Sequence, residues 1–300
     1  MIAAPLQSGW TELRGRTVLR LSGSDRVRYL NGQVTIDIPR LVPGCARRAC
    51  VLTAKGKLCA VVFIAAEPDS FRIDAESGLR EELLARVERY LVADDAAVLD
   101  VSNDTALFHW IGPIPGGAVP PGAACCEANR FGWTGTDLVV PAAEADKVRD
   151  ALQAFGSAVQ ASELERIRIE RGIPTWGAEL GPDTLPPEAR LDEIAIDYDK
   201  GCYLGQETIS RLRSVGHVNR SLRHLVAASA TLPVAGSELK GPNGEPAGRV
   251  TSAVFSFALD RGLGLGYVRR PFWDPGTLLS ATLPEPGGFV EVEVRLPPRL

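Results

Sequence analysis

The chain is predicted to be an α+β protein with a small β-barrel-like domain at its C-terminus. Strand-like and helical segments alternate up to about residue 172, short strand-like runs separated by Gly, Pro and Asn follow residue 222, and nothing after Gly236 has helical periodicity. The length of 300 residues suits about two domains. We expect a body over residues 1–222 and the β-rich domain over 223–300. The body is expected to hold two α+β lobes, roughly residues 1–50 with 155–222 and residues 51–154.

The first elements read as a strand, a helix and a hairpin. Residues 17–21 (TVLRL) are β-branched and alternating. Ser24 and Asp25 can cap a short helix that Gly32 can end. Residues 51–65 read as a hairpin that turns at Lys55-Gly56-Lys57.

The middle of the chain continues this alternation. A helix is expected where Leu79, Leu83, Val87 and Leu91 recur at helical spacing. Residues 112–122, rich in Pro and Gly, form the clearest loop. Further strands are expected at residues 71–73, 96–101, 106–111 and 138–140.

Two helices are then expected before the β-rich part. Residues 142–155 place Val148, Leu152 and Phe155 on one face. The next helix has a capping box at Ser162-x-x-Glu165 and a stop at Gly172 and Pro174. The strands expected beyond them are residues 225–228, 248–253, 263–268, 278–283 and 289–296, of which the last alternates strictly.

Composition excludes several classes of function. Lys plus Arg number 33 and Asp plus Glu 37, which gives a net charge of −4 and argues against a general nucleic-acid binder. The N-terminus lacks the charged and apolar regions of a secretory signal, and the longest nearly apolar run, residues 58–66, is too short to span a membrane. We expect a cytoplasmic protein without a membrane partner.

The six cysteines show no metal-site spacing. No C-x-x-C occurs and the three histidines are not spaced as ligands with the cysteines, so we expect no structural metal. Cys45, Cys50 and Cys59 read as buried free thiols. The neighbouring Cys125 and Cys126 lie in the Gly/Pro-rich loop region and receive no role.

The exception is Cys202, in the stretch Lys200-Gly-Cys-Tyr-Leu-Gly-Gln-Glu207. A thiol reacts as its thiolate, which Lys200 and the arginines downstream would favour if the fold brings them near. Gly201 and Gly205 permit a tight turn with exposed N–H groups. These features predict a functional thiol at Cys202. One thiol cannot hold an iron–sulfur cluster, so covalent chemistry, redox chemistry and transient donation of one ligand all stay open.

The residues after the cysteine predict a helix with a basic continuation. A helix starting near Gly205 would place Glu207 and Arg211 four apart, as a functional pair or as an ordinary surface salt bridge. The basic side chains that follow are Arg213, His217, Arg220 and Arg223.

The stretch from Lys200 to Glu207, with Arg211 after it, resembles the K-G-C-Y-x-G-Q-E signature of the YgfZ-type folate-binding proteins. These proteins are relatives of the T-protein (aminomethyltransferase) of the glycine cleavage system and are implicated in iron–sulfur cluster assembly or repair. The weaker matches run from about residue 19 to 270. They are Leu21 to Leu30, Thr35 with Asp37, Lys55-Gly56-Lys57, Gly132-Trp133-Thr134-Gly135, Arg168 to Pro174 and Gly266 to Arg269.

The resemblance implies a three-lobed aminomethyltransferase-like fold with a central cavity for tetrahydrofolate. Cys202 with Lys200 would act near that cavity, and Glu170 would contact the pterin ring. The other residues that it implies for folate binding are Arg168, Tyr203, Gln206, Glu207, Arg211 and Trp133. Arg213, Arg220 and Arg223 could hold the carboxylates of a folate polyglutamate tail, or form a solvated basic face.

One departure from the relatives bears on activity. Aminomethyltransferases carry a catalytic Asp after the hairpin turn, in a G-x-x-x-D-D context, where this chain has Ala60 and Val61. Neither side chain can move a proton or stabilise an iminium ion. The glycine-cleavage reaction is therefore not expected, and whether any other turnover occurs stays open.

Three hypotheses follow. The leading one is a folate-binding accessory protein of iron–sulfur cluster maintenance, whose partners are reduced folate and iron–sulfur client or scaffold proteins. The alternative is a folate-dependent one-carbon transferase that uses Glu170, Asp37 or Asp197 as acid or base. A thiol redox protein is the third, although no resolving cysteine lies near Cys202 in sequence.

Overall fold

The computed structural model describes residues 8–283 and 288–298 of the chain and divides it into two compact units. The N-terminal unit contains the described residues up to Gln160 together with Ile194–Thr208. The barrel unit contains Ala161–Glu193 and the described residues from Ile209 onward. The predicted boundaries near residues 50, 154 and 222 stay predictions, since these units divide the chain at 160, 193 and 208.

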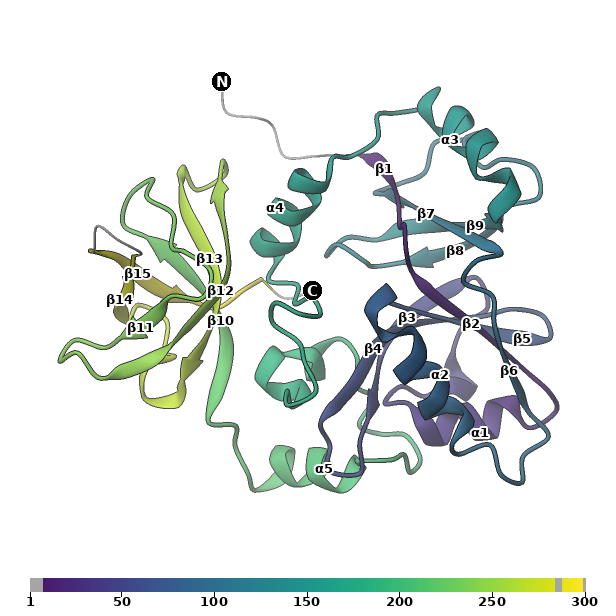
Figure 1. Ribbon diagram of the computed structural model, residues 1–300, viewed down its shortest axis with the longest axis horizontal. Helices are drawn as coiled ribbons and strands as arrows, with labels where there is room; N and C mark the ends of the chain where they lie inside the picture. Colours follow the sequence, from purple (N-terminus) through teal and green to yellow (C-terminus); the bar gives the residue numbers. More distant parts are fainter. Residues whose placement is uncertain (1–7, 284–287, 299–300) are drawn as a thin grey trace. The chain divides into compact units, whose positions relative to one another are not determined.

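A nine-stranded sheet forms the framework of the N-terminal unit, with its strands in purple to teal in Figure 1. Its order is β1-β7-β9-β8-β3-β4-β5-β2-β6, and every pair is antiparallel except β3 with β8. The bounds are β1 (Gly9–Glu12), β2 (Thr17–Ser22), β3 (Cys45–Leu52), β4 (Leu58–Ala66), β5 (Ser70–Ala75), β6 (Ala97–Asp100), β7 (Thr105–Ile111), β8 (Ala124–Ala128) and β9 (Gly135–Pro141).

Five α-helices and several 3-10 turns complete the described chain. The helices are α1 (Arg26–Gln33), α2 (Arg80–Glu88), α3 (Ala145–Gln153), α4 (Ala161–Arg171) and α5 (Gln206–Ser214). The 3-10 turns are η1 (Ile38–Arg40), η2 (Ser77–Leu79), η3 (Ala142–Glu144), η4 (Pro186–Ala189), η5 (Leu191–Glu193) and η6 (Arg270–Phe272). The division between the units falls inside α5, after Thr208.

The C-terminal strands close into a barrel, as the sequence predicted. Their order around it is β10-β13-β12-β11-β14-β15, and β15 pairs back onto β10. The bounds are β10 (Arg220–Ala227), β11 (Glu238–Lys240), β12 (Pro246–Ser256), β13 (Arg261–Arg269), β14 (Leu278–Thr282) and β15 (Phe289–Arg295).

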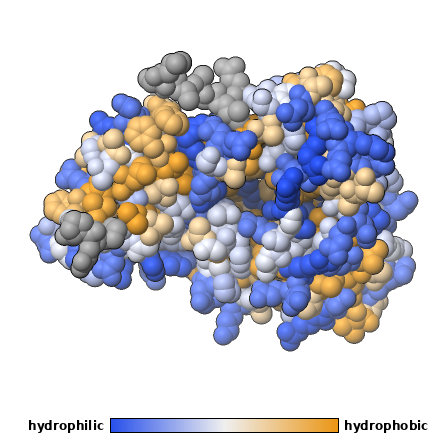
Figure 2. Space-filling model, turned by 45° about the horizontal axis from the view of Figure 1, so that its top comes forward, coloured by the Kyte–Doolittle hydropathy of each residue, from blue (hydrophilic) through white to orange (hydrophobic). Residues whose placement is uncertain are grey.

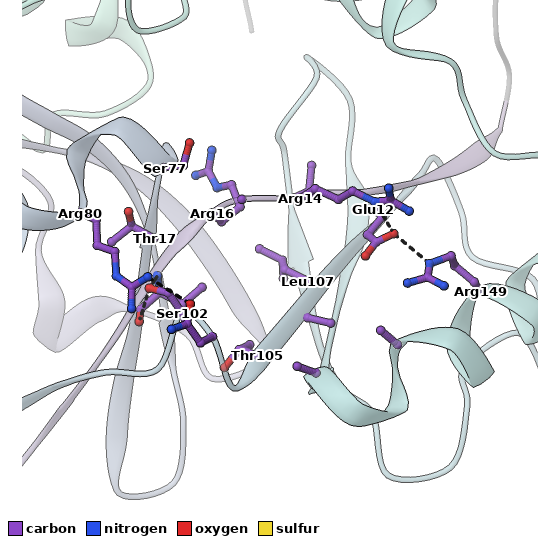
Figure 3. A pocket seen from close by; sticks show the side chains of 17 residues that line it. Glu12, Arg14, Arg16, Thr17, Ser77, Arg80, Ser102, Thr105, Leu107 and Arg149 are labelled. Atoms are coloured by element: carbon purple, nitrogen blue, oxygen red, sulfur yellow. Dashed lines mark hydrogen bonds and ion pairs between the residues drawn. The ribbon is translucent and has the colours of Figure 1, made fainter.

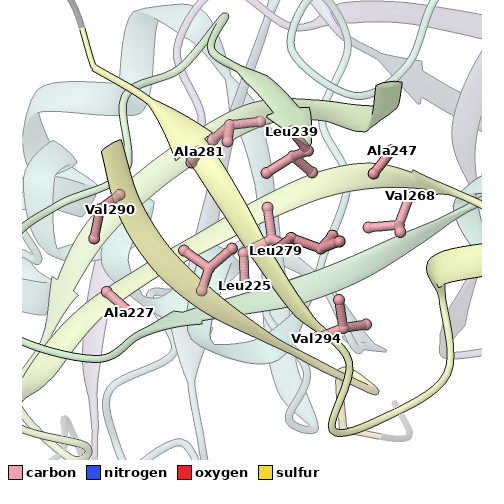
Figure 4. Packing of buried hydrophobic residues seen from close by; sticks show 11 residues of the cluster. Leu225, Ala227, Leu239, Ala247, Val268, Leu279, Ala281, Val290 and Val294 are labelled. Atoms are coloured by element: carbon pink, nitrogen blue, oxygen red, sulfur yellow. The ribbon is translucent and has the colours of Figure 1, made fainter. Parts of the chain in front are cut away.

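The barrel core consists of aliphatic side chains (Figure 4). The strict alternation of β15 explains its part, because Val290, Val292 and Val294 are buried while Glu291 and Glu293 are not. A one-residue slip of this strand would turn every valine outward, so the pattern fixes the register against β14.

A second core in the N-terminal unit surrounds Trp110, which is fully buried with Phe108 on β7. Helix α3 contributes Val148 and Leu152 to it from one face. Phe155 was expected on that face, but it lies beyond the end of α3 and is 43% exposed.

Some predicted element ends are confirmed and others are wrong. Gly56 has φ +75° at the hairpin turn, and Gly172 has φ +70° just after α4, so both occupy conformations that favour glycine. Gly32 does not end α1, which continues to Gln33. Ser162 is the second residue of α4 and not its cap, because the helix begins at Ala161.

Three short strands and two thiols differ from expectation. β1, β8 and β11 have three to five residues each, too short for a period to be recognised. Cys126 on β8 is buried, whereas Cys45 and Cys59 are only half-buried and Cys50 is buried as predicted.

The visible face in Figure 2 is mostly hydrophilic, with hydrophobic side chains in separate patches. Large exposed apolar side chains of the barrel include Leu278 and Phe289. Within residues 8–283 and 288–298, no helix has the length and hydropathy needed to cross a membrane.

Candidate functional site around Cys202

The segment that carries the cysteine motif is built into the N-terminal unit. The backbone N–H of Asp197 donates to the carbonyl of Thr35 at 2.9 Å, and that of Leu204 donates to Gly32 at 3.1 Å. The buried Thr35 hydroxyl donates to the carbonyl of Ala195 at 2.5 Å and accepts a bond from the N–H of Cys50. The T-x-D element of the sequence thus joins the motif segment to β3.

Lys200 anchors the motif at the end of α1. Its buried Nζ donates to the carbonyls of Asn31 at 2.6 Å and Val34 at 2.7 Å, which are among the carbonyls that a helix leaves unpaired at its C-terminus. The ammonium also lies 5.0 Å from the centre of the Tyr203 ring. Burial lowers the pKa of Lys200 to about 8. A structural role is evident, and the predicted chemical role beside the sulfur stays a prediction.

Cys202 itself is exposed and forms no disulfide. Tyr203, the next residue, is 8% exposed, and burial raises the pKa of its hydroxyl above the usual range. The motif therefore places an accessible thiol between buried anchors on either side. Tyr203 supports the segment from beneath, and its predicted contact with folate stays a prediction.

Two glycines let the motif approach the hairpin turn between β3 and β4. Gly205 has φ +87°, and a Cβ there would lie 2.6 Å from the carbonyl oxygen of Thr53. A Cβ on Gly56 would lie 2.8 Å from Cβ of Thr208. Larger side chains at these positions would push the β3–β4 turn away from the start of α5. Gly56 of the hairpin turn and Gly205 of the cysteine motif are therefore both needed for this one contact.

Helix α5 presents polar side chains directly after the cysteine. Gln206 is half-buried, while Glu207 and Arg211 are exposed. No ion pair joins Glu207 to Arg211 along this helix, all of which the structure describes. Both groups therefore keep their hydrogen-bonding capacity for a ligand or for water.

The carboxylate of Asp197 is engaged in hydrogen bonds within the protein. Arg47 donates to both of its oxygens at 2.8 Å, and the N–H of Asp37 donates to one of them at 2.7 Å. Burial raises the pKa of this carboxyl, but the hydrogen bonds from Arg47 outweigh it and hold the pKa below its usual range. Asp197 is thus a fixed anion that orders the loop, and a weak candidate for a general base.

Ala60 and Val61 lie on β4, opposite Val51 and Cys50 of β3. Ala60 is fully buried and Val61 is half-buried. The position that the resemblance assigns to the acid of aminomethyltransferases is therefore occupied by strand residues with no ionisable group.

The loop that contains Trp133 precedes β9, where a buried charge network lies. Trp133 is half-buried. Arg130 bridges Asp74 and Asp137 with bonds of 2.7 to 3.0 Å, and the Asp137 carboxylate also contacts Nδ1 of His109 at 2.8 Å. Burial raises the pKa of Asp137, but Arg130 and His109 hold it below its usual range. No sequence pattern identifies this network, because Asp74, His109 and Asp137 come from three separate strands and Arg130 from the loop between β8 and β9.

In the barrel unit, the guanidinium of Arg168 is held by hydrogen bonds to several side chains and is not a free cation. Its guanidinium donates to Glu165, to Glu179 at 3.1 Å and to the Ser252 hydroxyl at 2.7 Å. The side chain of Glu179 is fully buried and also accepts bonds from Thr251 and Ser252 of β12. The predicted folate contact of Arg168 stays a prediction, and Glu179 is a residue that sequence reasoning missed.

Glu170 is likewise held within the barrel unit. One carboxylate oxygen accepts from Arg166 at 2.6 Å and the other from Ser256 at 2.7 Å. It lines a pocket of about 260 Å³, which His224 and Arg295 also line. Glu170 is therefore not the freely solvated side chain that its position late in a helix suggests.

The basic run after Arg211 does not form one face. Arg220 pairs with Glu188 at 2.9 Å and lies over the Tyr267 ring. Arg223 is 8% exposed and donates to the carbonyl of Trp273. A uniform solvated basic face is thus not what the fold builds, while Arg213 and His217 are exposed.

Comparison with known proteins agrees with the sequence resemblance. Residues 220–299 match the family described as the glycine cleavage T-protein C-terminal barrel domain. The chain is 26% identical over 257 residues to the tRNA-modifying protein YgfZ of Enterobacter sp. (strain 638), covering 81% of this chain and 79% of the relative. It is 27% identical over 254 residues to the protein of the same name from Klebsiella pneumoniae (strain 342), covering 78% and 77%.

The fold is that of an aminomethyltransferase. The crystal structure of glycine cleavage system aminomethyltransferase T from Bartonella henselae matches with a TM-score of 0.86, over 98% of this chain and 86% of that chain, at 19% identity. The predicted resemblance to YgfZ-type proteins and the predicted aminomethyltransferase-like fold with its C-terminal barrel are both confirmed.

Proposed function

We propose that this chain, as a relative of the YgfZ proteins, is a tetrahydrofolate-binding accessory protein of iron–sulfur cluster assembly or repair, in which Cys202 is the functional thiol. One observation carries the proposal. The complete cysteine motif presents an exposed thiol on an anchored segment, while the strand that bears the acid in aminomethyltransferases has Ala60 and Val61. The chain therefore has the cysteine of the motif but lacks the acid on β4.

Two features of the described residues fit a reduced folate. The two oxygens of Glu170 each accept one hydrogen bond, and each has a further lone pair for the N–H donors of a pterin ring. On α5, the exposed Arg211 is available for a carboxylate of the glutamate tail. Bound folate would supply a one-carbon carrier or a redox-active pterin, and the protein would supply the thiol of Cys202.

The name of the relatives suggests the process in which the activity is used. YgfZ of Enterobacter is called tRNA-modifying, and we propose that this chain supports tRNA modification through an iron–sulfur enzyme and not by binding tRNA itself. The net charge of −4 supports this indirect role.

The test separates the folate site from the thiol. Isothermal titration with tetrahydrofolate is made on the wild type, Cys202→Ala and, as matched control, Cys125→Ala, whose thiol is also exposed. All three should bind with similar affinity. In a host that lacks its own copy, Cys202→Ala alone should fail to restore the activity of an iron–sulfur enzyme and the level of the modified tRNA.

The proposal is wrong if no reduced folate binds and Cys202→Ala restores both readouts. Direct binding of tRNA at physiological salt would replace the indirect role by a direct one. A one-carbon transferase remains the alternative, but no observation favours it. Of its candidate bases, Asp197 and Glu170 accept hydrogen bonds and Asp37 is in an ion pair with Arg40 at 3.3 Å.

A further inference from the structure

A second cavity lies in the N-terminal unit, away from the residues of the cysteine motif (Figure 3). Its volume is about 460 Å³, within the range of small-molecule sites. The β1–β2 turn, the start of α2, the segment before β7 and the face of α3 line it. None of the cysteine motif, Glu170 or Trp133 takes part.

Four arginines from three separate elements line this cavity, which we call the arginine pocket. They are Arg14, Arg16, Arg80 and Arg149. Glu12 is the one carboxylate among the lining residues, all of which the structure describes, so the lining carries four positive charges and one negative charge. Asp74, Asp100 and Asp146 also pair with these arginines but do not line the cavity, so the excess holds for the lining residues alone.

The hydrogen bonds that Arg80 and Arg149 make within the protein leave some of their N–H groups unused. Arg80 donates through Nε to Asp100 at 2.6 Å and through Nη1 to Asn103 at 3.1 Å. Arg149 donates through Nε to Glu12 at 2.9 Å and through Nη1 to Asp146. For both side chains, Nη2 has no partner in the described part of the chain.

The other two arginines have spare donors as well. Arg16 uses Nε and Nη2 on the fully buried Asp74, at 3.0 and 2.7 Å. Asp74 is shared with Arg130, so it does not neutralise Arg16 alone. Arg14 uses only Nε, on Glu12, and its side chain is 75% exposed. These contacts fix the guanidinium groups in place while N–H groups stay available.

The remaining lining combines polar donors with an apolar floor. The hydroxyls of Ser77 and Thr105 line the cavity together with the amide of Asn103. In Figure 3, Leu107 lies between the Arg80 side and the Arg149 side of the pocket. Ala142 belongs to the same apolar floor. Such a lining suits a molecule that has both an anionic group and an apolar body.

We propose that the arginine pocket binds a small organic oxyanion, either a phosphate ester with an apolar part or a polycarboxylate. An anionic group would accept a bond from Nη2 of Arg80 on one side of the pocket or from Nη2 of Arg149 on the other, and Ser77 and Thr105 would add hydroxyl donors. Charge-assisted bonds of this kind are the strong ones, and the lining offers several donors for them. The site is separate from Cys202, so this proposal is independent of folate binding.

The test uses adenosine monophosphate and citrate as probes, titrated calorimetrically into the full-length protein at low salt. At least one should bind, and Arg80→Gln or Arg149→Gln should weaken that binding by about tenfold, because each removes a charge-assisted bond. Arg14→Gln, at an exposed side chain that can be replaced without disturbing the core, should weaken it about threefold. The matched control is Arg270→Gln, an exposed arginine of η6 in the barrel unit, which should bind like the wild type.

The arms of the experiment distinguish the sources of the oxyanion. Binding of adenosine monophosphate alone identifies a phosphate ester, and binding of citrate alone a polycarboxylate. The proposal is overturned if neither probe binds, if Arg270→Gln weakens binding as much as Arg80→Gln, or if only a tRNA fragment binds. Tetrahydrofolate titrated into Arg14→Gln should bind unchanged, so failure here is distinguishable from failure of the folate site.

Discussion

Lys200 and Cys202 differ sharply in environment although they are two positions apart. The ammonium is buried on two carbonyls, while the thiol is exposed. Each carbonyl bond to a charged donor contributes about 1.5 to 3 kcal/mol where the geometry is good. The motif thus combines a buried structural anchor with an exposed thiol, which we propose is the functional group.

The buried ammonium of Lys200 predicts how the stability of the protein depends on pH. The pKa of Lys200 is about 8 in the fold and 10.5 as a reference value, so between these pH values the unfolded chain binds more protons. The free energy of unfolding of the wild type should therefore rise with pH relative to Lys200→Met. The gain is at most ~3 kcal/mol between about pH 8 and 10.5. Urea unfolding of both proteins over this range measures it.

The control for this measurement is Lys240→Met, because Lys240 is exposed on β11. Its difference from the wild type should not change with pH. A constant difference for Lys200→Met as well would mean that the ammonium is not desolvated in the fold.

The exposed thiols make a second prediction at this scale. Cys202 and Cys125 are exposed, whereas Cys126 is buried and burial raises its pKa to about 11. In native protein at neutral pH, an aromatic disulfide reagent should modify Cys202 and Cys125 at least about tenfold faster than Cys126. Mass spectrometry of the labelled peptides checks this order. Equal labelling of Cys126 would show that β8 opens readily.

At the scale of elements, the contact between the hairpin turn and α5 sets the position of the cysteine segment. It depends on Gly205 and Gly56, both at positive φ and both within 3 Å of the opposite segment if a Cβ is added. The KGK turn and the KGCYLGQE stretch are far apart in sequence, and this contact explains why each contains its glycine.

Gly205→Ala should cost about 2 to 4 kcal/mol of stability. The positive φ contributes about 1 to 2 kcal/mol and the clash with the Thr53 carbonyl the rest. Gly44→Ala is the matched control, since Gly44 has φ +80° but no atom within 4 Å of an added Cβ. It should cost only about 1 to 2 kcal/mol in the same urea unfolding experiment. Equal costs would contradict the close contact.

The elements also show what the sequence can and cannot predict. The hairpin at Gly56, the end of α4 at Gly172 and the alternation of β15 are set by local rules, and they were predictable. The partners of Lys200 and the burial of Glu179 depend on residues more than sixty positions away in the chain. Single-sequence patterns contain no information on such distant contacts, so the motif can be recognised in the sequence but its anchoring partners cannot.

At the scale of the whole molecule, the chain forms two units, each with its own buried charge. In the barrel unit, Arg168 and Glu179 connect α4 and the following segment to β12. Removal of one member of a buried ion pair is costly, because the other charge is left without compensation.

Arg168→Met should therefore destabilise the barrel unit by about 3 to 5 kcal/mol. Hydrogen exchange followed by mass spectrometry should show loss of protection in α4 and β12 and little change in β3 and β4 of the N-terminal unit. The double variant Arg168→Met with Glu179→Gln should recover part of the loss, since the buried charge is gone. Uniform loss of protection in both units would contradict their description as separate compact bodies.

The division of the chain has a consequence for its synthesis. The N-terminal unit needs residues 194–208, but the ribosome releases them only after the whole segment 161–193 of the other unit. Until then the end of α1 lacks the Lys200 ammonium, and Thr35 lacks the carbonyl of Ala195. The nascent N-terminal unit therefore stays incomplete until then, and the segment that carries Cys202 is the last part of the chain to complete it.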